Sequence, residues 1–345
     1  MKKIRDLDKI IKADYTAIYL TKTKKILETN NIKNKTILRY CHFEKEPIYV
    51  CGISHCVQIL KQIKGNFKVY GVKDGDLVEA GQPILVIVGD YTKVAETESV
   101  LDGILARESS VCNKVKRILT IIKPSKLIYM ADRADLYLTQ PYDGYAAYVG
   151  GARTFTSKAQ VELIDGKNVK VVGTVPHALI QQHNGNLSKA LKSYHKTFPK
   201  EKLSALVDYH NDVVNEIKNI DEGLRKDIVS IRIDTSKSMC DRSLKGFFKS
   251  NGVSTALVFN ARKTLDRYGM KHAKIIVSSG FDEEKIRKFE SCNIKPDFYG
   301  VGGSLVKVDV NITCDLVYLN GKPEAKAGRN LGIDLKSIKK LNIYI

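Results

Sequence analysis

The stretch NVKVVGTVPHALIQQH, Asn168–His183, joins a β-branched run to a helical pattern and places a histidine at the junction. The run Val169–Val172 ends at Gly173 and predicts a short buried strand, and Ala178–Ile180 begin a helical period. His177 therefore follows the C-terminal end of a strand. In a sheet of parallel strands, the loops at that end converge on one crevice. The alternative for a single histidine is a helix-start residue that hydrogen-bonds its neighbours.

Short apolar runs of the same kind recur on both sides of this stretch. They are Leu127–Met130, Leu203–Val207, Ile228–Ile233, Ile275–Val277 and Phe298–Val301. Helical patterns separate most of them, at Leu187–Tyr194, Val213–Leu224, Ala261–Tyr268 and Glu283–Phe289. Strands that alternate with helices predict right-handed βαβ units and a parallel sheet. Five or more such units predict a barrel-like α/β domain.

Reactive and phosphate-binding residue types follow these runs. They are Asp132 and Arg133; Gly173, Thr174 and His177; Asp208; Arg232, Asp234 and Thr235; Ser278, Ser279 and Gly280; and Gly300, Gly302 and Gly303. Serine and glycine at strand ends expose N–H groups that bind phosphate. Aspartates can hold Mg²⁺ between phosphate or ribose oxygens, and arginine binds a carboxylate or phosphate with two hydrogen bonds. Singly, each has another explanation, since glycines form turns, aspartates cap helices and arginines face water.

The N-terminal third has a different pattern. Leu7–Glu28 is helical with an interruption around Tyr15, and Thr36–Ile53 alternates like strands. Tyr70–Gly89 carries two turn dipeptides and predicts tight hairpins in a small β-sandwich, similar to the hammerhead sandwich of biotinyl and lipoyl domains but without their cofactor-carrying lysine. Thr92–Ile118 predicts one long helix whose acidic start and basic end suit the helix dipole.

Length and composition predict an ordinary globular chain. At 345 residues and 43% hydrophobic content it is large enough for two domains. No apolar run approaches a membrane span and no signal peptide is recognisable, so we expect a cytosolic protein without a membrane partner. Seven irregularly spaced cysteines indicate reduced thiols. The group Cys41, His42, Cys51, His55 and Cys56 matches no zinc spacing, so we favour a structural role for it.

The net charge of +19 favours anionic partners, such as nucleic acid, phosphorylated metabolites or acidic surfaces. The lysines are dispersed, and no nucleic-acid-binding motif accompanies them. We therefore expect a lysine-rich solvated surface and keep nucleic-acid binding as the weaker hypothesis.

Several motifs, in this order, resemble the nicotinate phosphoribosyltransferases of the type II phosphoribosyltransferase fold, closest to the shorter archaeal-like members. They are DGDLVEAGQPILVIVGDY (Asp74–Tyr91), ETESVLDGILAR (Glu96–Arg107), VGGARTFTS (Val149–Ser157), GTVPHALIQ (Gly173–Gln181), LVD (Leu206–Asp208), RIDTS (Arg232–Ser236), VSSGFDEEKI (Val277–Ile286), GVGGSL (Gly300–Leu305) and DLVYLNGKPEAKAGR (Asp315–Arg329). Where many members have R-x-D-S-G-D, this chain ends the motif with Lys237.

The resemblance implies an incomplete TIM-like α/β barrel with an N-terminal α/β sandwich domain that contains the hammerhead-like segment. The expected units are an N-terminal sandwich domain with its linking helix at residues 1–118 and a phosphoribosyltransferase barrel at 119–305. C-terminal strands at 306–345 are expected to return to the N-terminal domain.

The implied reaction joins nicotinate to phosphoribosyl pyrophosphate and releases pyrophosphate, with Mg²⁺ as cofactor and ATP as co-substrate. His177 would be phosphorylated by ATP, and Asp208 and Asp234 would contact Mg²⁺ and ribose. Substrate contacts are expected from Tyr15, Arg133, Thr174, Arg232 and Thr235, and phosphate contacts from Ser278, Ser279, Gly280, Gly300, Gly302 and Gly303.

Two further expectations come from the same resemblance. We expect a homodimer or higher homo-oligomer in which Tyr15 reaches the neighbouring subunit's site. Quinolinate or nicotinamide phosphoribosyl transfer is the alternative within the fold. An inactive relative that binds nucleic acid through its positive charge is the alternative from another class.

Overall fold

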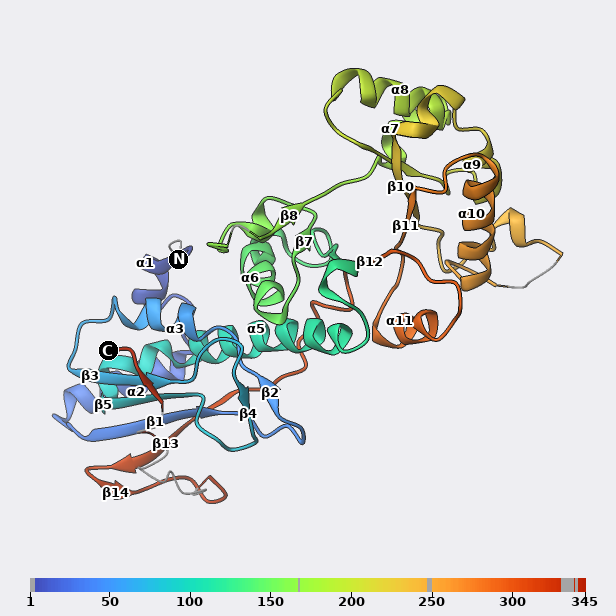
Figure 1. Cartoon of the computed structure of the whole chain (residues 1–345). Coiled ribbons are helices and arrows are strands. Elements are labelled where there is room, and N and C mark those ends of the chain that lie inside the picture. The colour runs from blue at the N-terminus through green and yellow to red at the C-terminus, as the bar shows by residue number, and fades with distance from the viewer. Residues whose placement is uncertain (1–3, 167, 247–249, 330–337, 339–340) are drawn as a thin grey trace.

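The computed structural model describes residues 4–166, 168–246, 250–329, 338 and 341–345, and it contains two large β-sheets. Figure 1 shows them side by side, with the N-terminal sheet at one end of the molecule and the parallel sheet beyond a long helix. The predicted fold class is confirmed. Residues 1–3, 330–337 and 339–340 of the two predicted terminal units lie outside the described residues.

The N-terminal sheet has six antiparallel strands. In spatial order they are β14 (Lys322–Pro323), β13 (Thr313–Leu319), β1 (Lys35–Cys41), β5 (Leu85–Asp90), β3 (Phe67–Gly71) and β15 (Asn342–Ile343). The strand β13 pairs with β1 from Thr36 opposite Leu319 to Cys41 opposite Thr313, and β15 pairs with β3. Segments more than 270 residues apart in sequence thus lie in one sheet.

The hairpins predicted for Tyr70–Gly89 are only partly correct. The turns are present, and both turn glycines, Gly75 (φ 94°) and Gly81 (φ 75°), have left-handed backbones. However, β4 (Leu77–Val78) pairs with β2 (Ile48–Tyr49), while β3 pairs with β5 across it. The short strand between them leaves the main sheet because its partner comes from an earlier segment.

Five helices accompany this sheet. They are α1 (Leu7–Ile11), α2 (Ile18–Thr29), α3 (Ile53–Leu60), α4 (Tyr91–Val94) and α5 (Glu98–Leu119). The single helix predicted for Thr92–Ile118 is divided by a 3₁₀ turn at Ala95–Thr97. The longest of the five, α5, runs between the two sheets in Figure 1. Its first half packs in the N-terminal core through Leu101 and Leu105, and its second half packs in the barrel core through Val111 and Val115.

The second sheet has seven parallel strands and is an incomplete barrel. In spatial order they are β8 (Lys170–Val171), β7 (Thr154–Phe155), β6 (Leu127–Tyr129), β12 (Phe298–Val301), β11 (Lys274–Val277), β10 (Ile228–Ile233) and β9 (Leu203–Leu206). The ladder is open between β8 and β9 within the described residues. A backbone hydrogen bond of 3.1 Å from Val175 N to Ser204 O crosses this opening.

The helices between these strands follow the predicted alternation. They are α6 (Gln140–Gly150), α7 (His177–Gln182), α8 (Leu187–Thr197), α9 (Val213–Lys218), α10 (Thr255–Arg267) and α11 (Glu283–Glu290). The sequence did not predict α6 or the two-residue strand β7. The helix α6 contains two glycines and packs so closely that a Cβ on Gly144 would overlap the backbone of Gln160.

The run Val169–Val172 is a strand, but the prediction that it is buried is wrong. Both residues of β8 are exposed, and Val171 and Val172 keep 45% and 37% of their surface. Among the described residues, β7 is the one strand that pairs with it. A β-branched run at an open sheet edge has the composition of a core strand without its burial.

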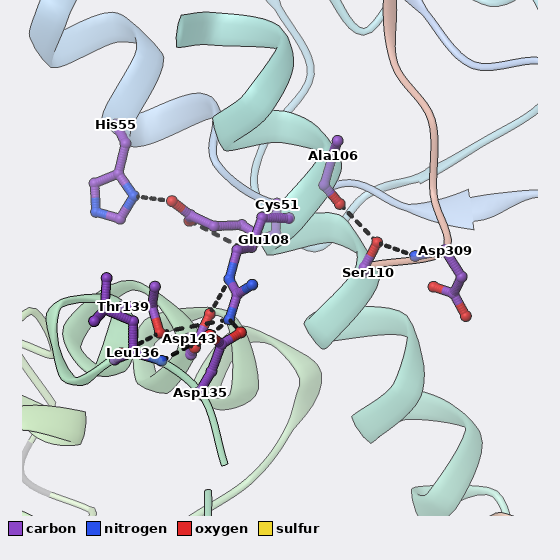
Figure 2. Close-up of polar contacts among 11 residues, drawn as sticks. Cys51, His55, Ala106, Glu108, Ser110, Asp135, Leu136, Thr139, Asp143 and Asp309 are labelled. Atoms are coloured by element: carbon purple, nitrogen blue, oxygen red, sulfur yellow. Dashed lines mark hydrogen bonds and ion pairs between the residues drawn. The ribbon is translucent and has the colours of Figure 1, made fainter. Parts of the chain in front are cut away.

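A polar cluster joins α3, α5 and α6 (Figure 2). His55 Nδ1 lies 2.6 Å from Glu108 Oε1, and both side chains are almost fully buried. The neighbouring Arg107 binds both carboxylate oxygens of Asp143 at 2.8 Å and also Asp135 at 2.8 Å. This cluster fixes the start of the barrel on the linking helix.

The expectations about membrane spans, cysteines and the Cys41–Cys56 group can be compared with the described residues. In that part of the chain, we find no helix that is both long and apolar enough to cross a membrane. The cysteines form no disulfide bond there, and the thiols of Cys51, Cys56 and Cys112 are buried. His42 and His55 each hydrogen-bond protein oxygens, which accords with a structural role for that group.

Candidate active site

A cavity of about 840 Å³ lies at the carboxyl ends of the parallel strands. Ten of the predicted site residues line it: Arg133, Thr174, Arg232, Asp234, Ser278, Ser279, Gly280, Gly300, Gly302 and Gly303. They come from the ends of five strands that are spread over more than 170 residues of sequence. Parallel strands therefore bring them to one crevice, as their positions after each apolar run predict.

Three side chains form a hydrogen-bonded chain across the ends of β10 and β11. Arg232 donates to Asp234 Oδ2 at 3.2 Å, and the Ser278 hydroxyl donates to Asp234 Oδ1 at 2.6 Å. The backbone supports this chain, since Ser278 N donates to Ile233 O at 3.0 Å. Both charged side chains are more than four-fifths buried. The Asp234 carboxylate is thus fixed in place, with a compensating guanidinium beside it.

The loop after β11 has an unusual backbone. Ser279 (φ 72°) and Gly280 (φ 67°) are both left-handed, and both line the cavity. Two residues after Gly280, Asp282 caps α11 by accepting from Lys285 N at 2.9 Å. A left-handed loop that leads into a helix start is a common arrangement for anion binding.

Close packing partly explains why two of the predicted phosphate-binding positions are glycines. A Cβ on Gly302 would come within 2.5 Å of Met130 O, and one on Gly300 would overlap the Met130 side chain. A larger residue at position 302 would push the end of β12 away from the Met130 backbone, whereas at position 300 the Met130 side chain would have to move. Gly303, by contrast, has open space around it on the cavity side.

His177 is the first residue of α7, as predicted, but its side chain lies beside the cavity and does not line it. Its Nε2 is 3.3 Å from Asp208 Oδ1, with the imidazole 45% exposed and the carboxylate 6% exposed. The hydrogen bond to Asp208 raises the pKa of His177, burial lowers it, and the charges of Asp208 and Asp234 raise it further. His177 and Asp208 therefore form a hydrogen-bonded pair at the edge of the cavity, within electrostatic range of Asp234.

Arg133 is exposed at the end of β6, on the cavity wall. Among the described residues it forms no ion pair, and Asp135, two residues further along the chain, binds Arg107 instead. The adjacent Asp132 accepts from the Thr156 hydroxyl at 2.9 Å. The guanidinium of Arg133 is therefore available to an anion in the cavity.

The remaining three predicted substrate residues differ in position. Thr174 lines the cavity, and its buried hydroxyl has no hydrogen-bond partner among the described residues. Thr235 is buried and does not line the cavity, and its hydroxyl also has no partner in the described part of the chain. Tyr15 lies outside this cavity, half exposed, with its hydroxyl donating to Asp6 at 3.2 Å.

Two lysines on the cavity wall were not predicted. Lys237 follows Asp234 by three residues, and Lys307 follows the GVGGSL motif. Both are exposed, and neither forms an ion pair within the described residues. The position of Lys237 in the RIDTSK motif was a sequence signal for it, whereas nothing in the sequence marked Lys307.

A Mg²⁺ ion would find few protein ligands here. Within the described residues, no group of three or more His, Cys, Asp or Glu side chains is arranged to hold a metal. Both oxygens of Asp234 already accept hydrogen bonds, whereas Asp208 has only Oδ1 engaged with His177. This donor set suits an ion that phosphate oxygens and water bind mainly, with one or two carboxylates from the protein.

Comparison with known proteins gives consistent matches. A family model for the quinolinate phosphoribosyl transferase N-terminal domain matches residues 14–109. A nicotinate phosphoribosyltransferase of Bacillus subtilis (strain 168) is 28% identical over 239 residues, 69% of this chain and 45% of that protein. One from Mycobacterium tuberculosis is 25% identical over 269 residues, 76% of this chain and 55% of that protein. The chain thus spans about half the length of these relatives.

Solved structures agree on the fold. A nicotinate-nucleotide pyrophosphorylase from Pyrococcus furiosus has a TM-score of 0.81 and 29% identity, over 95% of this chain and 81% of that one. Human nicotinic acid phosphoribosyltransferase has a TM-score of 0.71 and 15% identity, over 90% of this chain and 76% of that one, which supports the fold alone. The sheet architecture and these matches show the fold shared by nicotinate and quinolinate phosphoribosyltransferases, and the sequence matches support membership of the type II phosphoribosyltransferase family.

Proposed function

We propose that this protein transfers the phosphoribosyl group of phosphoribosyl pyrophosphate to the ring nitrogen of nicotinate, which forms nicotinate mononucleotide and pyrophosphate. The observation that carries the proposal is the composition of the cavity. Its lining combines the left-handed Ser279–Gly280 loop with Arg133 and with the fixed pair Arg232 and Asp234. The names of the relatives support nicotinate as the base.

The charges of the cavity suit this reaction. When the ribose–pyrophosphate bond breaks, positive charge develops on the ribose and negative charge on the departing pyrophosphate. The Asp234 carboxylate would stabilise the first, and Arg133, Arg232, Lys237 and Lys307 would stabilise the second. Mg²⁺, when bound with the pyrophosphate oxygens, would add charge neutralisation, with Asp234 on the cavity wall and Asp208 beside it as candidate protein ligands.

The test is an assay of the purified protein with phosphoribosyl pyrophosphate and Mg²⁺, supplied separately with nicotinate, nicotinamide or quinolinate, each with and without ATP. Nicotinate mononucleotide should be the main product. Failure to turn over any of the three bases, combined with salt-sensitive binding to random duplex DNA, would instead support the nucleic-acid-binding alternative.

Quinolinate is the second candidate base, and two observations favour it. The matched family model is the N-terminal domain of quinolinate enzymes. The cavity also carries four cationic side chains, which suits a second substrate carboxylate. Release of CO₂ with quinolinate in the same assay would identify this activity.

We also propose that ATP drives the reaction through His177, and that His177→Ala abolishes ATP stimulation while a slow ATP-independent transfer remains. Because Nε2 is engaged with Asp208, Nδ1 is the nitrogen available to accept a phosphoryl group. Mass spectrometry and ³¹P NMR of the ATP-treated protein should find the phosphate on Nδ1. ATP-stimulated turnover by the alanine variant would contradict this role.

The raised pKa of His177 gives this step a pH dependence. Only the neutral imidazole is nucleophilic, so the ATP-stimulated rate should fall on the acidic side with a midpoint above 6.5. The hydrogen bond to Asp208 is the largest cause of the shift, and Asp208→Asn should therefore move the midpoint to lower pH.

Arg133→Ala should raise KM for nicotinate much more than KM for phosphoribosyl pyrophosphate, by roughly tenfold to a hundredfold from the loss of a charged hydrogen-bonded contact. A guanidinium binds a carboxylate with two parallel hydrogen bonds, whereas an amide offers one acceptor and two donors. The variant should also narrow the preference for nicotinate over nicotinamide. Steady-state kinetics decide this, and an effect on phosphoribosyl pyrophosphate alone would assign Arg133 to the pyrophosphate.

The oligomeric state is the last part of the proposal. We propose a homodimer or higher homo-oligomer in which Tyr15 completes the site of the adjoining subunit, since within one chain it lies outside the cavity. Sedimentation equilibrium tests the oligomeric state, and an active monomer would refute it.

A further inference from the structure

Ser279 adopts a backbone conformation that serine normally avoids. Its φ of 72° lies in the left-handed region, where the Cβ of an L-residue crowds the neighbouring carbonyl oxygen. Six other non-glycine residues of the described chain share a positive φ, four of them asparagines, but Ser279 is the one among them that lines the cavity. Something in the surrounding structure must therefore stabilise this conformation.

The residues on either side of Ser279 and Gly280 are anchored to the barrel. Ser278 N donates to Ile233 O at 3.0 Å, and Phe281 O accepts from the Ser304 hydroxyl at 2.9 Å. Between these anchors, the described residues provide one hydrogen bond to the left-handed pair: Lys285 Nζ donates to Ser279 O at 3.3 Å.

The Lys285 side chain is positioned for this contact from the first turn of α11. Its ammonium lies 4.2 Å from the centre of the Phe281 ring, and it forms no ion pair among the described residues. The charge of Asp282 acts on Lys285, but its Oδ1 accepts from the Lys285 backbone N–H. Burial lowers the pKa of Lys285, with a smaller opposing effect of Asp282. The ammonium is thus half buried, directed to a backbone carbonyl and packed on an aromatic ring.

We propose that Lys285 is a positioning residue that holds Ser279 and Gly280 in the left-handed conformation required to bind the phosphate of the phosphoribosyl substrate. The proposal rests on the proposed function only for the identity of that ligand. Lys285 itself does not line the cavity, so its effect on the ligand is transmitted through the Ser279 carbonyl.

The experiment measures binding of ribose 5-phosphate by calorimetry to four variants of the full chain. Lys285→Met keeps the aliphatic stem on Phe281 but removes the donor, and we expect it to weaken binding about tenfold, the effect of one lost charged hydrogen bond. Lys285→Arg can donate to the same carbonyl and should stay within about twofold of the natural protein. Lys288→Met, exposed on the same helix, is the matched control and should have no effect.

A rescue separates positioning from a general loss of structure. Glycine adopts the left-handed region without the Cβ penalty, so the fourth variant, Ser279→Gly combined with Lys285→Met, should recover most of the lost affinity. A Lys285→Met protein that binds ribose 5-phosphate as tightly as the natural one, or a defect that Ser279→Gly does not relieve, would overturn the proposal.

A measurement without ligand distinguishes failure of the proposed role of Lys285 from failure of the proposed function. If the natural protein binds no ribose 5-phosphate, the proposed function is refuted. The role of Lys285 can still be tested then, by measuring the backbone conformation of Ser279 without a ligand. A crystal structure of ligand-free Lys285→Met should show Ser279 outside the left-handed region or in several conformations. An unchanged φ near 72° in that structure would overturn the role of Lys285.

Discussion

Asp234→Asn is expected to lower kcat/KM for phosphoribosyl transfer by about 10²–10³, with little change in folding, by comparison with the loss of one preorganised electrostatic group at an active site. Asparagine keeps the shape, and its carbonyl oxygen can still accept from Arg232 while its amide N–H donates to the Ser278 hydroxyl. It removes the negative charge that would face the developing positive charge on the ribose. The Arg232 guanidinium, four-fifths buried, would also lose its compensating charge.

Initial rates with varied phosphoribosyl pyrophosphate test this effect, and circular dichroism melting confirms folding. Ser278→Ala is the informative companion, because it removes the hydroxyl that orients Asp234 at 2.6 Å and leaves the charge in place. We expect a loss of about tenfold from it, as for one hydrogen bond to a charged group. Activity of Asp234→Asn within threefold of the natural enzyme would show that the carboxylate has no electrostatic role in the transition state.

Glu108→Ala should reduce the free energy of unfolding by about 3–5 kcal/mol, the usual cost of removing one partner of a buried ionic pair. Figure 2 shows the carboxylate between His55 and Cys51, at the junction of α3 and α5. His55 is fully buried, its Nε2 has no partner among the described residues, and its ring packs on Tyr142 and Tyr145. Without Glu108, neither ring nitrogen would have a polar contact that the structure describes.

Urea denaturation followed by far-ultraviolet circular dichroism measures the loss of stability. Tryptophan fluorescence cannot serve here, because the chain contains no Trp. Glu108→Gln should cost less because the amide still reaches His55. Glu28→Ala, at an exposed position near the end of α2, should change stability by less than about 0.5 kcal/mol. Equal effects of the alanine substitutions at positions 108 and 28 would contradict the assignment.

The same pair gives stability a pH dependence. Burial lowers the pKa of His55, but the charge and hydrogen bond of Glu108 outweigh it and leave that pKa above 6.5. A proton on His55 therefore binds more tightly in the folded chain than in the unfolded one. The corresponding stabilisation is complete below pH 6.5 and is lost as the pH rises through the folded-state pKa.

The sequence predicted the parallel sheet because its buried strands are continuous apolar runs, each followed by residue types that are common in loops and at helix starts, such as Gly, Ser and Asp. The strands β10 and β12 have the predicted bounds, Ile228–Ile233 and Phe298–Val301. The strand β7 was missed because its two residues, within GGARTFTS, are too few to show any periodicity. Burial of Val169–Val172 was mispredicted because composition does not tell an edge strand from a central one.

The cavity residues were more predictable than the contacts that support them. Strand-end position brought Arg232, Asp234 and Ser278 together, because parallel topology converts order along the chain into proximity. The pair His55 and Glu108 is 53 residues apart on two helices whose packing no local pattern specifies. The contact from Lys285 to Ser279 depends on a left-handed backbone at a serine, which the residue type itself disfavours.

The return of the tail to the N-terminal sheet has a consequence for synthesis of the chain. Until β13 and β15 emerge from the ribosome, β1 and β3 are both edge strands, each with a row of unpaired backbone groups. At about 5–20 residues per second, translation from the end of β1 to the start of β13 takes roughly 10–50 s. During that interval the nascent N-terminal segment is open to intermolecular strand pairing. Holding chaperones should therefore engage the first hundred residues until β13 and β15 have been made.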